Sequence, residues 1–249
     1  MSNSCPSCQA SVQKGAATCN VCGWTFNDST QKMKTIVRPA GRPKIQVELE
    51  VATTIDRTAS SNQFAKGIPI IWEMILKPLE PKTRNTECWV QTHGDQDEGQ
   101  MPITIIDGAT VDQAIEEIKK ITYQGGGDPP EHHLDAIEHL LNTTPWSLDP
   151  TQSRGVILAF LTADSKPATT GSTASEIGKK IKDQGILLYL VCQPTPCLRE
   201  LVDVADGLLF EITNDPDPDD LKRIAGQLSA SIVATVGSGA TAPLNPVTQ

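Results

Sequence analysis

The segment VELEVATTIDRTASS, residues 47–61, begins as an apolar, β-branched run and ends in three oxygen-bearing side chains at alternate positions. The run predicts a buried strand, because β-branched residues favour extended backbone. The three polar residues at its end are Asp56, Thr58 and Ser60. A carboxylate at the end of a buried strand is costly unless something offsets its charge, so this end of the strand is a candidate ligand site.

Strands and helices alternate along the rest of the chain. We expect strands at 45–55, 86–93, 101–107, 154–164, 185–193 and 206–213, and helices at 64–79, 110–121, 130–142, 173–184 and 217–236. The continuous apolar runs at 154–164 and 185–193 are typical of strands buried on both faces of a parallel sheet. Helix starts are indicated by Thr110 with Gln113 in a capping box and by Asp217 beside Pro218. The alternation predicts an α/β fold, with a doubly wound, mostly parallel six-stranded sheet flanked by helices.

The first 26 residues form a separate unit in this interpretation. They hold four of the seven cysteines, in two CxxC pairs separated by ten residues: Cys5, Cys8, Cys19 and Cys22. Two such pairs supply the four sulfurs of a tetrahedral zinc site, and the segment resembles a zinc ribbon. So small a unit has almost no core, so Zn²⁺ is expected to supply most of its folding free energy. The odd number of cysteines indicates reduced thiols, which favours a cytoplasmic location.

Composition suggests the other boundaries. Residues 27–44 are polar and basic and predict a linker, 45–236 form the main domain, and 237–249 predict a disordered tail. Residues 1–47 carry six basic side chains against one acid, and the rest of the chain carries 15 against 29, a net charge of −14. So acidic a main domain argues against extensive nucleic-acid binding. No secretory signal or long apolar span is present, so we expect no membrane partner.

Two further segments carry oxygen ligands. The strand at 154–164 ends in Asp164, and the glycine-rich loop YQGGGDPPEHH brings Asp128 and Glu131 to the start of a helix. In doubly wound sheets ligands bind at the carboxyl ends of the strands, so these groups are expected to converge with Asp56. Carboxylates and hydroxyls favour Mg²⁺ or Mn²⁺, with Ca²⁺ as another hard cation. The alternative for Asp56 and Thr58 is ordinary helix N-capping.

Three motifs in this order resemble a von Willebrand factor A (vWA) domain over residues 45–236: DRTAS at 56–60, GGGDPPE at 125–131 and LTAD at 161–164. The resemblance implies a Rossmann-like fold and a metal-ion-dependent adhesion site with Asp56, Thr58, Ser60 and Asp164 as matching ligands. An acidic side chain of a partner protein would complete the metal shell. The second loop is similar to that of integrin β subunits, which implies Glu131 as a direct ligand and Asp128 in an outer position or an adjacent cation site. Which of the two binds directly stays open.

We therefore expect a non-enzymatic, cytoplasmic interaction module, an adaptor similar to bacterial vWA proteins that act beside kinases, phosphatases and phosphothreonine-binding proteins. One alternative is a magnesium-dependent phosphoryl-transfer enzyme. Another is a nucleic-acid-associated scaffold that acts through the zinc ribbon. Two further features are interpreted as solvent-exposed: the turn GDQDEGQ at 94–100, and His132, His133 and His139 on one helix, with Asp135 pairing with His139.

Thr35 lies in the basic segment MKTIVRP and is a candidate site for a serine/threonine kinase. Phosphosite mapping of protein from its native cells is expected to find it modified. A Thr35 that is unmodified under all conditions would contradict the hypothesis.

Overall fold

The computed structural model describes residues 3–4, 11–13, 21, 47–62, 67–127, 129–213 and 216–246. Near the N-terminus, β1 (Asn3–Ser4) pairs antiparallel with β2 (Ser11–Val12). The four cysteines of the expected zinc ribbon, the linker at 27–44 with Thr35, and Asp128 lie outside the described residues.

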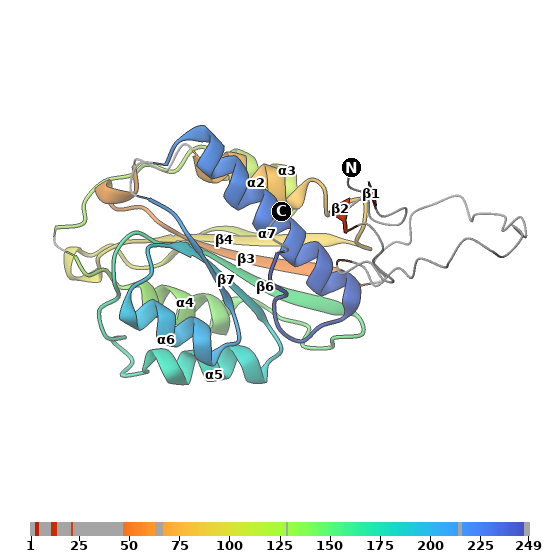
Figure 1. Cartoon of the computed structure of the whole chain (residues 1–249). Coiled ribbons are helices and arrows are strands. Elements are labelled where there is room, and N and C mark those ends of the chain that lie inside the picture. The colour runs from red at the N-terminus through yellow and green to blue at the C-terminus, as the bar shows by residue number, and fades with distance from the viewer. Residues whose placement is uncertain are drawn as a thin grey trace, which may run out of the picture.

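The main domain contains one six-stranded sheet with strand order β5-β4-β3-β6-β7-β8 (Figure 1). All neighbouring strands are parallel except β5, which is antiparallel to β4. The strands are β3 (Glu48–Asp56), β4 (Thr86–His93), β5 (Ile103–Ala109), β6 (Ser153–Phe160), β7 (Leu187–Cys192) and β8 (Leu208–Glu211). The predicted six-stranded, mostly parallel sheet is confirmed.

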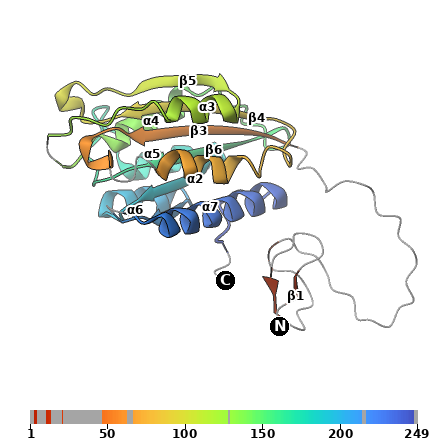
Figure 2. The same ribbon diagram turned by 90° about the horizontal axis from the view of Figure 1, so that it is seen from above.

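Helices cover both faces of this sheet. Figure 1 shows α2, α3 and α7 over one face and α4, α5 and α6 over the other, and Figure 2 shows α7 running beside α2. The helices are α2 (Gly67–Leu76), α3 (Val111–Ile118), α4 (His133–Thr143), α5 (Ala174–Asp183), α6 (Pro196–Val204) and α7 (Pro218–Ser238). Two short 3₁₀ helices, η1 (Ala59–Ser61) and η2 (Gln96–Glu98), follow β3 and β4.

The central strand β3 contributes to both cores. Leu49, Val51 and Ile55 pack into the core beneath α2 and α7, whereas Ala52 packs into the core on the α4 side. Because both faces are covered, the strand is buried almost throughout rather than at alternate positions. Thr53 is satisfied by the indole of Trp72, whose Nε1 donates to Thr53 Oγ1 over 3.1 Å.

Helix starts follow the expected capping chemistry in two cases. Thr110 and Gln113 form a capping box at α3, and Asp217 caps α7 beside Pro218. The predicted helix start at Pro130, however, is wrong, because α4 begins at His133. Glu131 instead forms an isolated parallel β-bridge with Ser165.

The edge strand β5 is irregular. Its pairing with β4 shifts register twice, between Cys88 and Val90 and between Val90 and Gln91, and Gly108 in β5 has φ +69°. A left-handed residue of this kind is typical of a β-bulge and favours glycine.

The described C-terminal residues fold back on α7. Leu244 N donates to Thr235 Oγ1 over 2.9 Å, and Leu244 O accepts from Ser231. Within the described residues, none of the helices combines the length and apolarity needed to span a membrane.

Two helical glycines are expected to respond oppositely to substitution by alanine. A Cβ on Gly178 would lie 2.8 Å from the backbone oxygen of Leu201, so Gly178→Ala must push α5 away from α6. A Cβ on the exposed Gly226 of α7 meets nothing within 4 Å. We expect Gly178→Ala to lower the free energy of unfolding by about 1–3 kcal/mol and Gly226→Ala to raise it by up to about 1 kcal/mol. Urea titrations of both variants test this, and stabilisation by Gly178→Ala would contradict the close packing of α5 on α6.

Candidate metal centre

Asp56, the last residue of β3, is a fully buried carboxylate. Its Oδ1 accepts a hydrogen bond from the Thr58 amide over 2.8 Å, and its Oδ2 accepts one from the Thr162 hydroxyl. Burial alone would raise the pKa of Asp56, but His133 and His93 when their rings are protonated, and these hydrogen bonds, lower it. Asp56 is therefore ionised at neutral pH although it has no contact with solvent.

Three hydroxyls lie beside this carboxylate. Thr58 Oγ1 is 2.8 Å from Ser60 Oγ, and Ser60 Oγ is 3.4 Å from Thr162 Oγ1. Thr58 occupies the N-cap position of η1, but its side chain makes no capping hydrogen bond. The hydroxyl of Thr58 is thus directed to the cluster rather than used for helix capping.

Glu131 approaches the same place from the loop before α4. Glu131 is only 3% exposed, and its Oε2 is buried without a hydrogen-bond partner among the described residues. Gly126 lies between Glu131 and Thr58, because a Cβ on Gly126 would be 2.6 Å from Thr58 Cβ and 3.2 Å from Glu131 Oε1. Gly126 also has φ +82°, so the glycine permits both the backbone turn and the close approach.

The charge balance of this site favours a cation. Burial, and then the carboxylates of Asp56 and Asp95, raise the pKa of Glu131 to about 7. Two buried carboxylates near each other destabilise each other's charged forms unless a positive charge lies between them. A hard cation suits a donor set of carboxylate and hydroxyl oxygens, and the unpartnered Oε2 of Glu131 is a free donor for it.

Asp164 makes different contacts. Its Oδ1 accepts hydrogen bonds from Ser165 N over 2.9 Å and from Thr195 Oγ1 over 2.6 Å, at the start of α6. The side chain of the LTAD motif that contacts Asp56 is that of Thr162. Sequence reasoning missed Thr162, although it lies two residues from Asp164 in the same motif. The structure thus brings Asp56, Thr58, Ser60 and Glu131 together, and connects Asp164 to α6.

A chain of buried polar groups runs beneath α4 next to Asp56. His93 Nε2 is 2.9 Å from His133 Nδ1, and His93 Nδ1 is 2.9 Å from Thr54 Oγ1. Burial lowers the pKa of His93 to about 3, so this ring is uncharged at neutral pH. His139, further along α4, is 2.8 Å from Gln91 Oε1.

The interpretation of the three helical histidines as surface residues is therefore wrong. His132 and His133 are buried, and His139 is partly buried. Asp135 accepts hydrogen bonds from the amide and hydroxyl of Thr169 rather than pairing with His139. The periodicity of the helix could not show that these histidines are buried. The hydrogen-bond partners of His133 and His139 are polar side chains of β4, which is distant in sequence.

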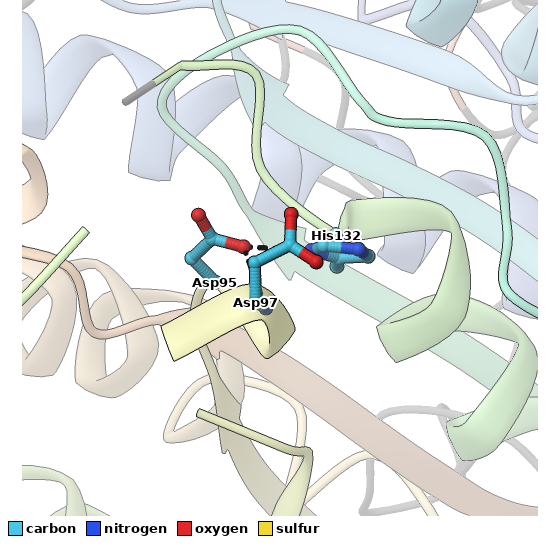
Figure 3. Close-up of side chains that lie close together, drawn as sticks. All are labelled: Asp95, Asp97 and His132. Carbon is cyan, nitrogen blue, oxygen red and sulfur yellow. Dashed lines mark hydrogen bonds and ion pairs between the residues drawn. The ribbon is translucent and has the colours of Figure 1, made fainter. Parts of the chain in front are cut away.

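A second polar cluster lies beside Glu131. Figure 3 shows Asp95 and Asp97 of the β4–β5 turn pointing towards His132, and the three side chains offer ligand atoms within 4.8 Å of one another. Such a group could hold a metal ion. Lys166, however, places its Nζ 2.9 Å from Asp95 Oδ2 and 2.7 Å from Asp97 Oδ2. The interpretation of this turn as solvated is wrong for Asp95, which is fully buried.

No protein-family model matches the sequence, and no curated protein matches it. Among solved structures, the chain is similar to the SpRpn10 VWA domain, with a TM-score of 0.51 and 14% sequence identity over 72% of this chain and 94% of that one. It is also similar to proximal thread matrix protein 1 from the mussel byssus, with a TM-score of 0.58 and 13% identity. That match covers 76% of this chain and 47% of the byssus protein, so the chain spans about half of it. The chain therefore has the α/β fold of vWA domains.

Glu131→Gln is expected to stabilise the metal-free protein at about pH 8, by about 1–2 kcal/mol in the free energy of unfolding, and to change it little at about pH 5. The pKa of Glu131 is raised from 4.5 to about 7 in the folded state. The preference of the folded state for protonated Glu131 adds to the free energy of unfolding, fully so below the unfolded pKa of 4.5. This contribution is lost as the pH rises through 7 and the carboxylate ionises beside Asp56. Urea titrations at both pH values in magnesium-free buffer measure the difference. Equal effects at the two pH values would contradict the raised pKa.

Proposed function

We propose that this protein is a metal-dependent interaction module, which binds partner proteins through a divalent cation held by Asp56, Thr58, Ser60 and Glu131. The observation that carries the proposal is the unpartnered, buried Oε2 of Glu131 next to the buried carboxylate of Asp56. Mg²⁺ or Mn²⁺ suits these oxygen donors best, and Ca²⁺ is a third candidate. When bound, the cation would neutralise the two carboxylates and offer a coordination position to an oxygen of the partner, such as an Asp or Glu side chain.

The neighbouring residues receive supporting roles in this proposal. Thr162 orients Asp56 through its hydroxyl, and Asp164 fixes the loop after β6 through Thr195. Asp164 would then act on the metal from outside its immediate contacts. Asp128, three residues before Glu131 in the sequence, stays the candidate for an outer position or an adjacent cation site that the resemblance implies.

The rest of the chain fits an adaptor. A zinc ribbon formed by Cys5, Cys8, Cys19 and Cys22, joined by the basic linker at 27–44, would give a second binding surface. We propose a cytoplasmic, non-enzymatic role in a multiprotein signalling complex, with kinases, phosphatases or phosphothreonine-binding proteins as partner classes and Thr35 as a modified residue. The likeness to vWA domains agrees with the interaction role, but the role is argued from the site at the loops rather than from the fold.

Asp56→Ala is expected to remove the divalent cation while leaving the fold intact. Calorimetric titration of the zinc-loaded full chain should find roughly one Mn²⁺ per chain in the wild type and no measurable binding at this site in the variant. Asp107→Asn, a change of an exposed carboxylate on β5, is the matched control and should bind like the wild type. Equal Mn²⁺ binding by wild type and Asp56→Ala would overturn the proposed site.

Partner binding is tested with the same variants. Tagged wild type and Asp56→Ala are compared by pull-down from native lysate in Mg²⁺, because a chelator would also remove zinc. Partners recovered only with the wild type would support binding through the metal face, and equal recovery would contradict it. Two results would favour other functions: phosphoester hydrolysis lost in Asp56→Ala, and salt-dependent nucleic-acid binding lost on deleting residues 1–44.

A further inference from the structure

We infer that Lys166 is a positioning residue for the metal centre: its ammonium group acts as a built-in cation that fixes the β4–β5 turn against the loop carrying Glu131. The inference rests on the proposed function, because it assigns Glu131 to the metal. It concerns a side chain that contacts neither Asp56 nor the hydroxyl cluster in any hydrogen bond or ion pair of the described residues.

The ammonium of Lys166 joins two carboxylates of the turn. Its Nζ lies 3.0 Å from Asp95 Oδ1, 2.9 Å from Asp95 Oδ2 and 2.7 Å from Asp97 Oδ2. The side chain of Lys166 is 17% exposed and that of Asp95 only 1%. Hydrogen bonds from Lys166 and from the Asp97 amide lower the pKa of Asp95 despite its burial, so both partners are charged. A buried, charged pair of this kind holds its geometry strongly, because a displaced partner would leave an unpaired buried charge.

The backbone of the same residue holds Glu131. Lys166 N donates to Glu131 O over 2.7 Å, and Glu131 N donates to Asp164 O over 3.0 Å. His132, the residue after Glu131, places Nδ1 3.0 Å from Asp95 Oδ1. Asp95, Lys166, Glu131 and His132 therefore form a closed ring of contacts around the loop.

The β4–β5 turn also contacts the glycine-rich segment that precedes Glu131 in the chain. Glu98 Oε2 accepts a hydrogen bond from Gly126 N over 2.9 Å, and Gln100 Nε2 donates to Gln124 O over 2.9 Å. Gly126 is the residue that separates Glu131 from Thr58. Through the turn, Lys166 thus acts on both segments that fix the position of the Glu131 carboxylate.

Lys166 also explains why Asp95, Asp97 and His132 do not need a second metal ion. A metal ion bound by these ligand atoms would lie about 2.0–2.5 Å from the same oxygens that contact Nζ. It would then sit beside an ammonium group and be repelled by it. The lysine fills the place that a cation would take.

Electrostatics and positioning predict opposite effects when Lys166 is removed. Loss of a positive charge near a cation site raises the affinity for the cation, because a repulsion disappears. Loss of the contacts that orient a ligand lowers that affinity, typically by about 10–100-fold. The sign of the change therefore separates the two roles.

The test is calorimetric titration of the zinc-loaded full chain with Mn²⁺, comparing wild type with Lys166→Met. The affinity considered is that of the component lost in Asp56→Ala. Without Lys166, a second group of ligands could take up Mn²⁺: Asp95, Asp97 and His132. The Lys166→Met/Asp56→Ala double variant measures this second binding, which is then subtracted. We expect Lys166→Met to weaken binding about tenfold or more, and Lys166→Arg, which retains the charge and can bridge both carboxylates, to restore most of it.

Two further variants separate positioning from general instability. Lys166→Met/Asp95→Asn removes the lysine together with its buried partner, and the carboxylate it leaves unpaired, that of Asp97, is exposed to solvent. This variant should keep the fold yet bind Mn²⁺ weakly. Lys182→Met removes a lysine whose Nζ lies 2.7 Å from Asp206 Oδ2 and should bind like the wild type. Unchanged or tighter Mn²⁺ binding by Lys166→Met, with Asp56→Ala still deficient, would overturn the inference and leave the proposed function intact. Equal binding by wild type and Asp56→Ala would overturn both.

Discussion

The burial of an ionised carboxylate at the end of the central strand is the constraint on which this site depends. Asp56 has no solvent contact, because β3 is paired on both edges and covered on both faces. Hydrogen bonds from Thr58 and Thr162 satisfy its oxygens but supply no charge. The buried ring of His93 next to it is uncharged. The negative charge of Asp56 and Glu131 is thus left for a cation to balance.

The loops at this end of the sheet are held by polar contacts rather than by an apolar core. The segment after β6 is bound to α4 by Asp135, which accepts from Thr169, and by Glu138, which accepts from Thr170, Ser172 and Lys180. The bridge between Glu131 and Ser165 connects the same segment to the loop before α4. A site built on loops needs such support, because ligand geometry must be fixed within fractions of an ångström.

The sequence alone predicted the sheet and its layers because their signals are local. Apolar runs mark β3, β6 and β7, and the caps at Thr110 and Asp217 mark helix starts. The vWA motifs also located Asp56, Thr58, Ser60 and Glu131 near one another. The structure differs from the prediction where distant segments make contact. The bridge to Ser165 moves the start of α4 to His133, and contacts with β4 bury the histidines at α4. Lys166 has no local pattern, and the LTAD motif does not by itself show that Thr162 contacts Asp56, since both roles depend on partners 69–106 residues away.

The irregular edge of the sheet has a consequence for the protein in crowded solution. Strand β5 has one edge without a neighbouring strand in the described sheet, and such edges offer backbone groups on which another chain can add a strand. The two register shifts and the left-handed Gly108 bend this edge away from a regular ladder. A straight strand of another molecule would find matching hydrogen bonds over only a few residues. The bulge thus opposes sheet-to-sheet aggregation, together with the exposed carboxylate of Asp107 in the same strand.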